Sequence, residues 1–116
     1  MLSPQNRLKK KKDFEKVFKQ GDSIKGNLFF LKKINNQKDY TRVGFIVSKK
    51  ISNRAVVRNK IKRQLREATR EELKNYDGKN DLIIVALSPI KRVGYKEIKK
   101  DISLVFRKIY NSKIKQ

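Results

Sequence analysis

The stretch from Lys49 to Glu67 decides how the rest of the chain can be organised. It reads Lys49-Lys50-Ile51-Ser52-Asn53-Arg54-Ala55-Val56-Val57-Arg58-Asn59-Lys60-Ile61-Lys62-Arg63-Gln64-Leu65-Arg66-Glu67. At about 100° per residue, the apolar residues after Arg54 fall within an arc of roughly 80°. The members of this stripe are Val57, Ile61, Leu65 and Ala68. The pattern predicts a helix over residues 54–75, capped by Ser52 or Asn53 and seated on a core by its narrow apolar side.

The same stretch is strongly cationic. Its basic residues are Lys49, Lys50, Arg54, Arg58, Lys60, Lys62, Arg63 and Arg66. On the predicted helix an arc of about 140° lies beside the apolar stripe. Its members are Arg58, Asn59, Lys62, Arg63, Arg66 and Arg70. A merely solvated face normally mixes charge signs, whereas this arc is expected to lack carboxylate partners. Guanidinium groups grip phosphate oxygens bidentately, and Asn59 can contact a sugar hydroxyl or a base edge, so the sequence predicts a phosphate-binding face.

Composition points to the same kind of partner. The 116 residues are enough for one domain, predicted to span residues 1–116, and they carry a formal net charge of +21. Such a field favours a polyanion, either nucleic acid or, as the rival, an anionic membrane surface. The chain has no cysteine and no histidine, which excludes disulfides and Cys/His metal sites. No apolar run is long enough for a transmembrane helix or a signal peptide, so a soluble cytoplasmic protein is expected.

The rest of the chain alternates between helical and extended patterns. The predicted elements are, in order, a helix over Lys9–Gln20 ended by Gly21, a strand or turn over Asp22–Ile24, strands over Asn27–Ile34 and Tyr40–Ser48, the basic helix, a strand over Asp81–Leu87, and a helix from Gly94 or Tyr95 to Tyr110. The short turn after residue 34 predicts an antiparallel hairpin between the strands on either side of it. The continuous apolar run of residues 81–87 is typical of a central strand buried on both faces.

The order α-β-β-β-α-β-α predicts an α+β two-layer sandwich, with helices packed on one side of a mixed sheet of about four strands. In the first helix, Phe14 and Phe18 are i, i+4 neighbours. They can anchor that helix in a core, or they can lie partly exposed in a groove where their faces pack on unpaired nucleotides. Both can hold at once. Periodicity does not give the hand of the crossover through the basic helix.

Residues suited to catalysis are sparse. Without histidine and cysteine, the commonest general base and the best nucleophile are missing. The chain also has no phosphate-loop or dinucleotide fingerprint. Asp81, at the head of a strand, could help to hold Mg²⁺, but a two-metal nuclease needs several converging carboxylates, and the eleven acids are scattered. We therefore expect no catalytic residue and no metal site on the protein itself.

The chain resembles the bacterial ribonuclease P protein subunit in segments that cover nearly its whole length and follow that family's order. These segments are Arg7-Leu8, Asp13-Phe14-Glu15-Lys16-Val17-Phe18-Lys19-Gln20-Gly21, Arg42-Val43-Gly44-Phe45-Ile46-Val47-Ser48-Lys49-Lys50, Val57-Arg58-Asn59-Lys60-Ile61-Lys62-Arg63-Gln64-Leu65-Arg66-Glu67, Asp81 to Ala86, and a closing helix with Phe106-Arg107-Lys108. Residues 57–67 resemble the family's basic signature helix, which is far more specific than a merely Arg/Lys-rich helix.

The resemblance implies a fold shared with the second domain of ribosomal protein S5, with a left-handed βαβ crossover. It implies a holoenzyme that removes the 5′ leader from precursor tRNA, using Mg²⁺ held mainly by a catalytic RNA. That RNA and precursor tRNA would be the partners, with no DNA and no membrane. The residues implied to bind the catalytic RNA are Lys49, Lys50, Arg54, Arg58, Asn59, Lys60, Lys62, Arg63 and Arg66. Those implied to line a leader-binding cleft, between the sheet and the first helix, are Phe14, Phe18, Phe30 and Lys32.

Three features depart from the family's usual pattern. Lys60 stands where the signature often has arginine, which removes a bidentate donor. The segment after Lys50 contains Ser52 and is one residue longer, including Arg54. Lys32 stands where many members carry a tyrosine that faces the leader, which would replace base stacking with attraction to a phosphate.

Other classes of protein predict other features. A structural ribosomal protein of the same fold family should lack the combination of the basic signature with Phe14 and Phe18. A helix-turn-helix DNA-binding protein needs a second helix soon after the basic one, where residues 76–87 indicate a loop and a strand. A membrane-active helix would carry large apolar residues opposite its charge, whereas the narrow stripe fits burial in a core.

Overall fold

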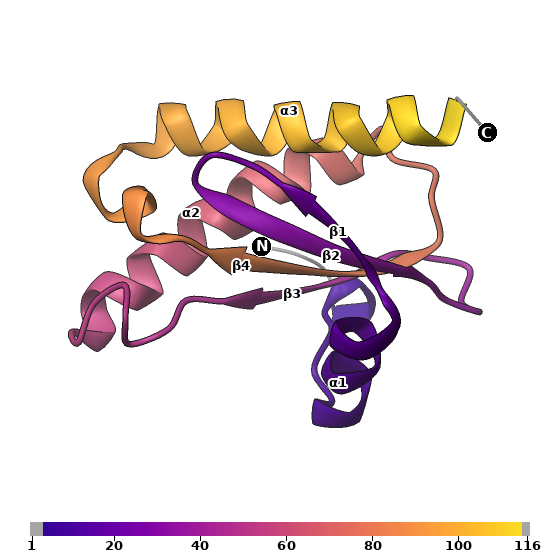
Figure 1. The fold of residues 1–116 in the computed structure, drawn as a ribbon, viewed down its shortest axis with the longest axis horizontal. Helices are drawn as coiled ribbons and strands as arrows, with labels where there is room; N and C mark the ends of the chain where they lie inside the picture. Colours follow the sequence, from indigo (N-terminus) through magenta and orange to yellow (C-terminus); the bar gives the residue numbers. More distant parts are fainter. Residues whose placement is uncertain (1–3, 115–116) are drawn as a thin grey trace.

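Four strands form one mixed sheet, on which three helices pack (Figure 1). The computed structural model describes residues 4–114, with side chains from residue 5 to residue 109. Its elements are α1 (Lys11–Gln20), β1 (Asp22–Lys25), β2 (Phe29–Asn35), β3 (Arg42–Ile46), α2 (Ala55–Leu73), β4 (Asn80–Ala86) and α3 (Tyr95–Ile114), with short 3-10 turns η1 (Pro4–Asn6) and η2 (Ser88–Arg92). The predicted order α-β-β-β-α-β-α is confirmed, and the segment from Asp22 is a strand.

The strand order in the sheet is β1-β2-β4-β3. β4 pairs antiparallel with β2 and parallel with β3, so β3, α2 and β4 form one crossover unit. The predicted hairpin between the strands on either side of residues 36–40 is therefore wrong, because β4 lies between them. β4 is apolar on both faces and nearly all of it is buried, which is why it takes the position with a neighbour on each side. The hairpin that does form joins β1 and β2.

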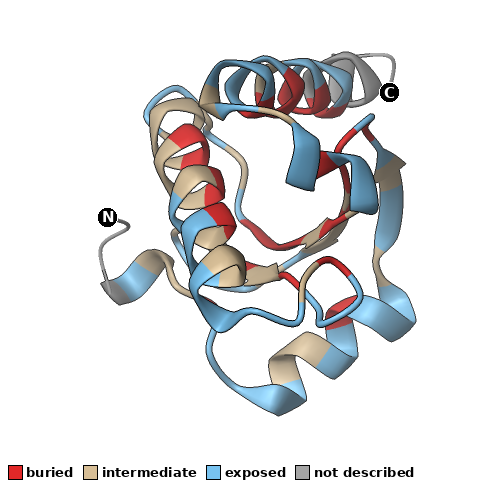
Figure 2. Ribbon diagram, turned by 90° about the vertical axis from the view of Figure 1, so that its left-hand side faces the viewer, coloured by how far each residue is buried: buried red, intermediate tan, exposed pale blue. Residues whose placement is uncertain are grey.

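The main core lies between one face of the sheet and the helices α2 and α3. The apolar stripe of α2 is confirmed, because Ile61, Leu65 and Ala68 are buried and Val57 packs against the same cluster. α3 contributes its own buried side chains to this cluster, namely Ile98, Ile102, Val105, Phe106 and Ile109. In Figure 2 the buried residues of both helices line their inner sides, while the outer sides are exposed or intermediate. The cationic arc of α2 is thus left on the surface.

α1 packs on the opposite face of the sheet, so the expectation that the helices would share one side is wrong for α1 (Figure 1). Val17 is fully buried there against Leu8 and Ile83. The physical reason is that this second face is also apolar, since Ile34, Ile46 and Val85 point to it from three strands. A ten-residue helix is too short to cover all of that face, and part of it is left accessible.

An arginine fixes α1 to the sheet. Arg42 of β3 donates from Nε and Nη2 to the two carboxylate oxygens of Asp81, at 2.9 and 2.6 Å, and from Nη1 to Asp13 of α1 at 3.3 Å. The side-chain amide of Asn36 also donates to Asp81, at 2.8 Å. Asp81 is only 6% exposed, so this bidentate pair supplies the partner that a buried carboxylate needs. The hydrogen bond with Asp81 raises the pKa of Arg42.

The N-terminus of α2 differs from the predicted cap. The N-cap residue is Arg54, and no side chain caps the helix. Ser52 instead accepts a hydrogen bond at its Oγ from the backbone N–H of Arg54, at 3.2 Å. Its carbonyl oxygen accepts from Nη1 of Arg58, at 2.9 Å. Because Ile51 is also buried, the segment before α2 is held in a defined conformation next to the helix.

A candidate RNA interface on two faces

The first part of the candidate site is the cationic surface of α2 and the segment before it. Six of its nine predicted residues are exposed, namely Lys49, Lys50, Arg54, Asn59, Lys60 and Arg63, and three are intermediate, namely Arg58, Lys62 and Arg66. Among the described residues, no ion pair joins any of the eight cations in this set to a carboxylate. Their mutual repulsion is therefore uncompensated within the described part of the chain, as expected for a surface that meets a polyanion.

Contrary to the prediction, Arg70 is not one of the unpaired cations of this surface. Its Nη2 donates to Glu67 at 2.5 Å and lies 3.6 Å from Glu71. The hydrogen bond from Arg70 lowers the pKa of the Glu67 carboxyl. The helical arc placed Arg70 beside the other cations, but side chains three residues apart also meet, and here the carboxylate was close enough to pair.

The cations of α2 point to two flanks. Arg66 lines a hollow of about 210 Å³ together with residues of the N-terminal segment, of α1 and of β3. These other residues are Arg7, Leu8, Lys9, Phe14, Val43, Gly44 and Phe45. Lys60 and Arg63 instead border Tyr95, at the start of α3. The flank that carries Arg66 therefore faces the side of the molecule where α1 lies, and Lys60 is directed away from it.

The second part of the candidate site is the α1 side of the sheet. β2 places Phe30 and Lys32 on this side, because residues two apart on a strand share a face with Ile34. The register sets Phe30 opposite Val85, which in turn pairs with Ile46, so three half-buried apolar side chains lie in one row. α1 adds a half-buried Phe14 and an exposed Phe18, and Phe18 is 38% exposed.

Phe14 lies directly on Gly44 of β3. A Cβ atom at that glycine would come within 2.6 Å of Cε1 and 3.2 Å of Cε2 of the Phe14 ring. The missing side chain thus makes room for the ring, and α1 can sit close to the sheet. Phe14 packs against the apolar cluster of Leu8, Val17 and Ile83, which agrees with an anchoring role, while Phe18 keeps an accessible ring. The packing of these rings on nucleotides stays a prediction.

The N-terminal segment joins the two faces. Arg7 pairs with Val43 in a parallel bridge, and the backbone N–H of Leu8 donates to the carbonyl oxygen of Val43 at 3.0 Å. This brings Arg7 and Lys9 to the hollow that Arg66 and Phe14 also line. Sequence reasoning did not assign either residue to the site. The only signal was Arg7-Leu8 in the family resemblance, and the pairing of Arg7 with Val43 of the edge strand β3 was not visible.

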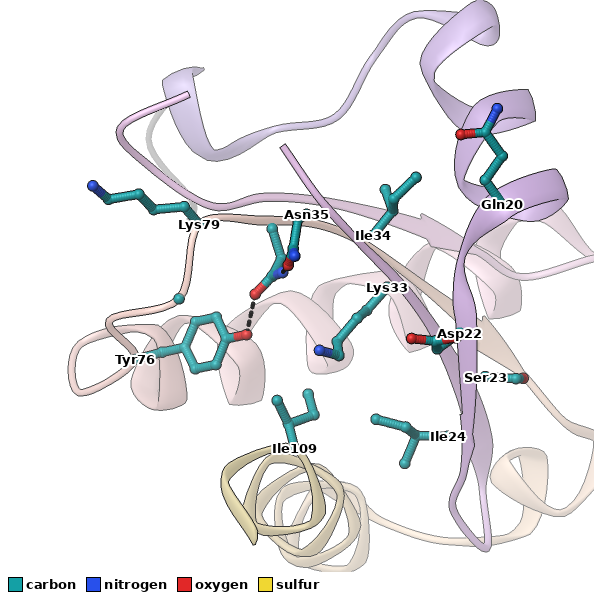
Figure 3. A pocket seen from close by; sticks show the side chains of 12 residues that line it. Gln20, Asp22, Ser23, Ile24, Lys33, Ile34, Asn35, Tyr76, Lys79 and Ile109 are labelled. Carbon is teal, nitrogen blue, oxygen red and sulfur yellow. Dashed lines mark hydrogen bonds between the residues drawn. The ribbon is translucent and has the colours of Figure 1, made fainter. Parts of the chain in front are cut away.

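A further hollow lies toward the opposite edge of the sheet, near the end of α1 and the edge strand β1 (Figure 3). It measures about 580 Å³, and its walls include Asp22, Lys33, Tyr76 and Ile109. Tyr76 is held there by a hydrogen bond to Asn80 and by an edge-to-face contact with Phe106. None of the residues predicted to bind RNA lines this hollow.

The carboxylates of the described residues do not suit a metal. No group of three or more acidic residues that could hold an ion occurs among residues 4–114, where the chain has neither histidine nor cysteine. Asp81, the one candidate that the sequence offered, has its two oxygens engaged by Arg42 and Asn36. The described carboxylates therefore offer no site for a metal ion. The part of the chain that the structure describes also holds no helix that is long and apolar enough to cross a membrane.

Comparison with known proteins decides the family. The family model described as Ribonuclease P matches residues 2–110. The chain belongs to the Ribonuclease P protein family. A ribonuclease P protein component of Bacillus velezensis is 44% identical over 108 residues, which cover 92% of this chain and 91% of that protein. One of Bacillus mycoides is 37% identical over 116 residues, which cover 99% of this chain and 100% of that protein.

A solved structure gives the same result for the fold of this ribonuclease P family member. The RNase P protein of Staphylococcus aureus superposes with a TM-score of 0.81 at 35% identity, covering 88% of this chain and 93% of that one. Because superposition preserves handedness, the β3–α2–β4 crossover has the same hand as in that protein. The α+β fold predicted from the sequence is confirmed.

Proposed function

We propose that this chain is the protein subunit of ribonuclease P and that it binds both the catalytic RNA and the 5′ leader of precursor tRNA. It thereby promotes endonucleolytic removal of the leader, which gives the mature tRNA 5′ end. The observation that carries the proposal is the match of the family model to residues 2–110, in a chain whose signature helix carries cations that pair with no carboxylate among the described residues. Membership of the family places the chain in an endoribonuclease holoenzyme.

The catalytic RNA binds the cationic surface of α2. The support is the run of eight cations without a carboxylate partner among the described residues, on a helix whose other side is fixed in the core. Arg58, Lys62 and Arg66 follow one another at four-residue spacing and therefore share one flank. Lys49, Lys50 and Arg54 extend the surface before the helix. Their contribution is electrostatic, because each neutralised phosphate releases counterions and relieves the repulsion between two RNAs in one complex.

The leader binds the α1 side of the sheet. An unpaired strand exposes base faces, which stack on aromatic side chains, and phosphates, which attract lysine. Phe18 and Phe30 offer ring surface, Phe14 offers its accessible part, and Lys32 stands in the middle of the same face. Lys32 pairs in register with Ser23 and Ile83, so its ammonium group has no carboxylate as cross-strand neighbour. Because Arg66 of α2 and Phe14 of α1 line the same hollow, the proposed leader face and the proposed surface for the catalytic RNA adjoin each other there.

The chemistry itself belongs to the RNA in this proposal, with Mg²⁺ held mainly by that RNA. What supports it is the residue inventory of the protein, which lacks histidine and cysteine and uses its one well-placed carboxylate in an ion pair. The protein's residues bind, orient and neutralise charge. We expect the complex to work in the cytoplasm, where bacterial precursor tRNA is made.

The test compares substrates with and without a leader. This protein is assembled with a bacterial ribonuclease P RNA, and the affinities for precursor tRNA and for mature tRNA are measured. The proposal predicts a protein-dependent preference for the precursor, which Phe18→Ala reduces by about fivefold to 150-fold, as expected for the loss of one stacked base at about 1–3 kcal/mol. Leu104→Ala is the matched control, because Leu104 of α3 is exposed to the same extent, 38%. Equal affinity for both RNAs, or equal losses in both variants, would contradict a leader site on α1.

A further inference from the structure

α3 carries a second cationic surface, which the site described above does not use. Its members are Lys96, Lys99, Lys100, Ser103 and Arg107, and we call this set the α3 stripe. The four cations are exposed, and they border a shallow hollow of about 360 Å³ on the outer side of the helix. Figure 1 shows α3 on the side of the sheet that is remote from α1. The α3 stripe is therefore far from the proposed leader face.

The charges of the α3 stripe have no compensation among the described residues. No ion pair joins any of its four cations to a carboxylate there. The two acids of this part of the helix are engaged elsewhere. Glu97 accepts a hydrogen bond from the backbone N–H of Gly94 at 3.2 Å, and buried Asp101 accepts from Asn27 and Leu28 in the β1–β2 turn. Like charges three and four residues apart, as at Lys96, Lys99 and Lys100, destabilise a helix unless an anion neutralises them.

The α3 stripe is separate from the cationic surface of α2. Glu67 lines a hollow together with Tyr95 at the start of α3, and burial together with the charges of Glu67 and Glu71 raises the pKa of Tyr95. Arg70 and Lys74 pair with these acids and neutralise them. Lys60 and Arg63 reach the start of α3 at Tyr95, but Arg66 lies on the flank of α2 that faces α1, and the α3 stripe continues along the helix to Arg107. An RNA segment held on the Arg66 flank would not extend along the outer side of α3. A second anionic segment is consequently needed to neutralise the α3 stripe.

The shape and composition of the α3 stripe indicate which anion it fits. Lys96 and Arg107 lie eleven residues apart, so at a rise of about 1.5 Å per residue the cations extend over roughly 16 Å in a straight line. No aromatic residue lies among them, and the one large apolar neighbour is Leu104. Single strands are bound on aromatic platforms and membranes by broad apolar faces, and the α3 stripe has neither. A-form duplexes are recognised through their backbone and shape, which straight rows of cations suit.

We propose that the α3 stripe binds the phosphate backbone of a double-stranded RNA segment in the ribonucleoprotein. The inference rests on the proposed function only in taking RNA, and not DNA, as the source of the duplex. The protein then contacts RNA on two sides. The single-stranded leader and the catalytic RNA lie on the α1 side and on the cationic surface of α2, and a duplex lies on the outer side of α3.

The first test compares two variants, each of which loses three positive charges. One variant carries Lys96→Gln, Lys100→Gln and Arg107→Gln; the control carries Lys38→Gln, Lys74→Gln and Lys79→Gln, which are exposed and lie outside both surfaces. The dissociation constant for a bacterial ribonuclease P RNA is measured over a range of salt. The α3 variant should flatten the slope of log affinity against log salt by about three, at about one per lost phosphate contact. The control should change the slope by less than one; equal changes in both variants would overturn the proposal.

The second test locates the RNA. Because the chain has no cysteine, Ser103→Cys gives a unique attachment point for a tethered iron–EDTA probe, and Asn53→Cys gives one beside the α2 surface. Position 103 should cut both strands of one RNA helix, at nucleotides distinct from those cut from position 53. Cuts from position 53 alone would refute the α3 inference and leave the proposed function intact, whereas no cuts from either would refute both. A duplex DNA that competes as well as the matching RNA would overturn the assignment to RNA.

Discussion

Replacing Gly44 by alanine should push Phe14 off the sheet. The added Cβ would lie within 2.6 Å of Cε1 and 3.2 Å of Cε2 of the Phe14 ring, well inside van der Waals contact. The ring cannot move freely, because α1 is held by buried Val17 and by the contact of Asp13 with Arg42. Overpacking of this kind costs about 1–3 kcal/mol, which we expect as a loss in the free energy of unfolding.

A double-mutant cycle isolates the contact. In a Phe14→Ala background the ring is gone, and Gly44→Ala should then be neutral or should stabilise by about 0.5–1 kcal/mol, because alanine loses less backbone entropy than glycine on entering a strand. Urea unfolding of the four proteins measures the cycle. The same cost of Gly44→Ala in both backgrounds would refute the packing of Phe14 on Gly44 as the reason. Gly44→Ala should also weaken binding of leader-bearing tRNA more than that of mature tRNA.

Three further outcomes follow from the structure. Arg66→Ala should weaken RNA association by about 1–3 kcal/mol and reduce the salt slope by about one without unfolding the protein; unfolding instead would make the residue structural. Arg42→Met leaves the buried carboxylate of Asp81 unpaired and should cost about 3–5 kcal/mol in urea unfolding, a value that would drop below about 1 kcal/mol if the pair were dispensable. Arg70 lowers the pKa of the Glu67 carboxyl, so the stabilisation from this pair is present at neutral pH and is lost as the pH falls through the folded-state pKa. An NMR titration should find the Glu67 pKa raised back towards its ordinary value in Arg70→Gln, and an unchanged pKa would remove Arg70 as the cause.

The sequence predicted those parts of the fold that depend on local periodicity. The stripe of Ile61, Leu65 and Ala68 marks the buried side of α2, and the apolar run of β4 marks a central strand; both are confirmed. The predicted hairpin of β2 and β3 is wrong because the length of the local turn says nothing about a strand that begins only at Asn80 and inserts between them. The prediction that α1 shares one side of the sheet with the other helices is wrong for a related reason. The apolar residues of β4 point alternately to the two faces of the sheet, so both faces are apolar, and local sequence does not tell which helix covers which face.

The candidate site, like the fold, could be predicted from the sequence only in part. The structure brings Phe14, Phe18, Phe30 and Lys32 to one side of the sheet, and the register that places Phe30 and Lys32 there follows from strand alternation. The pairing of Arg70 with Glu67 was missed, since a helical arc gives directions but not side-chain conformations. The position of Arg7 and Lys9 near Arg66 depends on a bridge to β3 that no local pattern encodes. Which residues touch RNA stays a prediction of charge and resemblance.

The most direct test of the central claim is single-turnover cleavage of precursor tRNA by a bacterial ribonuclease P RNA at low Mg²⁺, with and without this protein. The account predicts strong stimulation by the protein, with cleavage at the mature 5′ end, because the protein neutralises RNA repulsion and holds the leader while the RNA supplies the chemistry. Tight, salt-sensitive binding to the RNA without any stimulation of cleavage would contradict it.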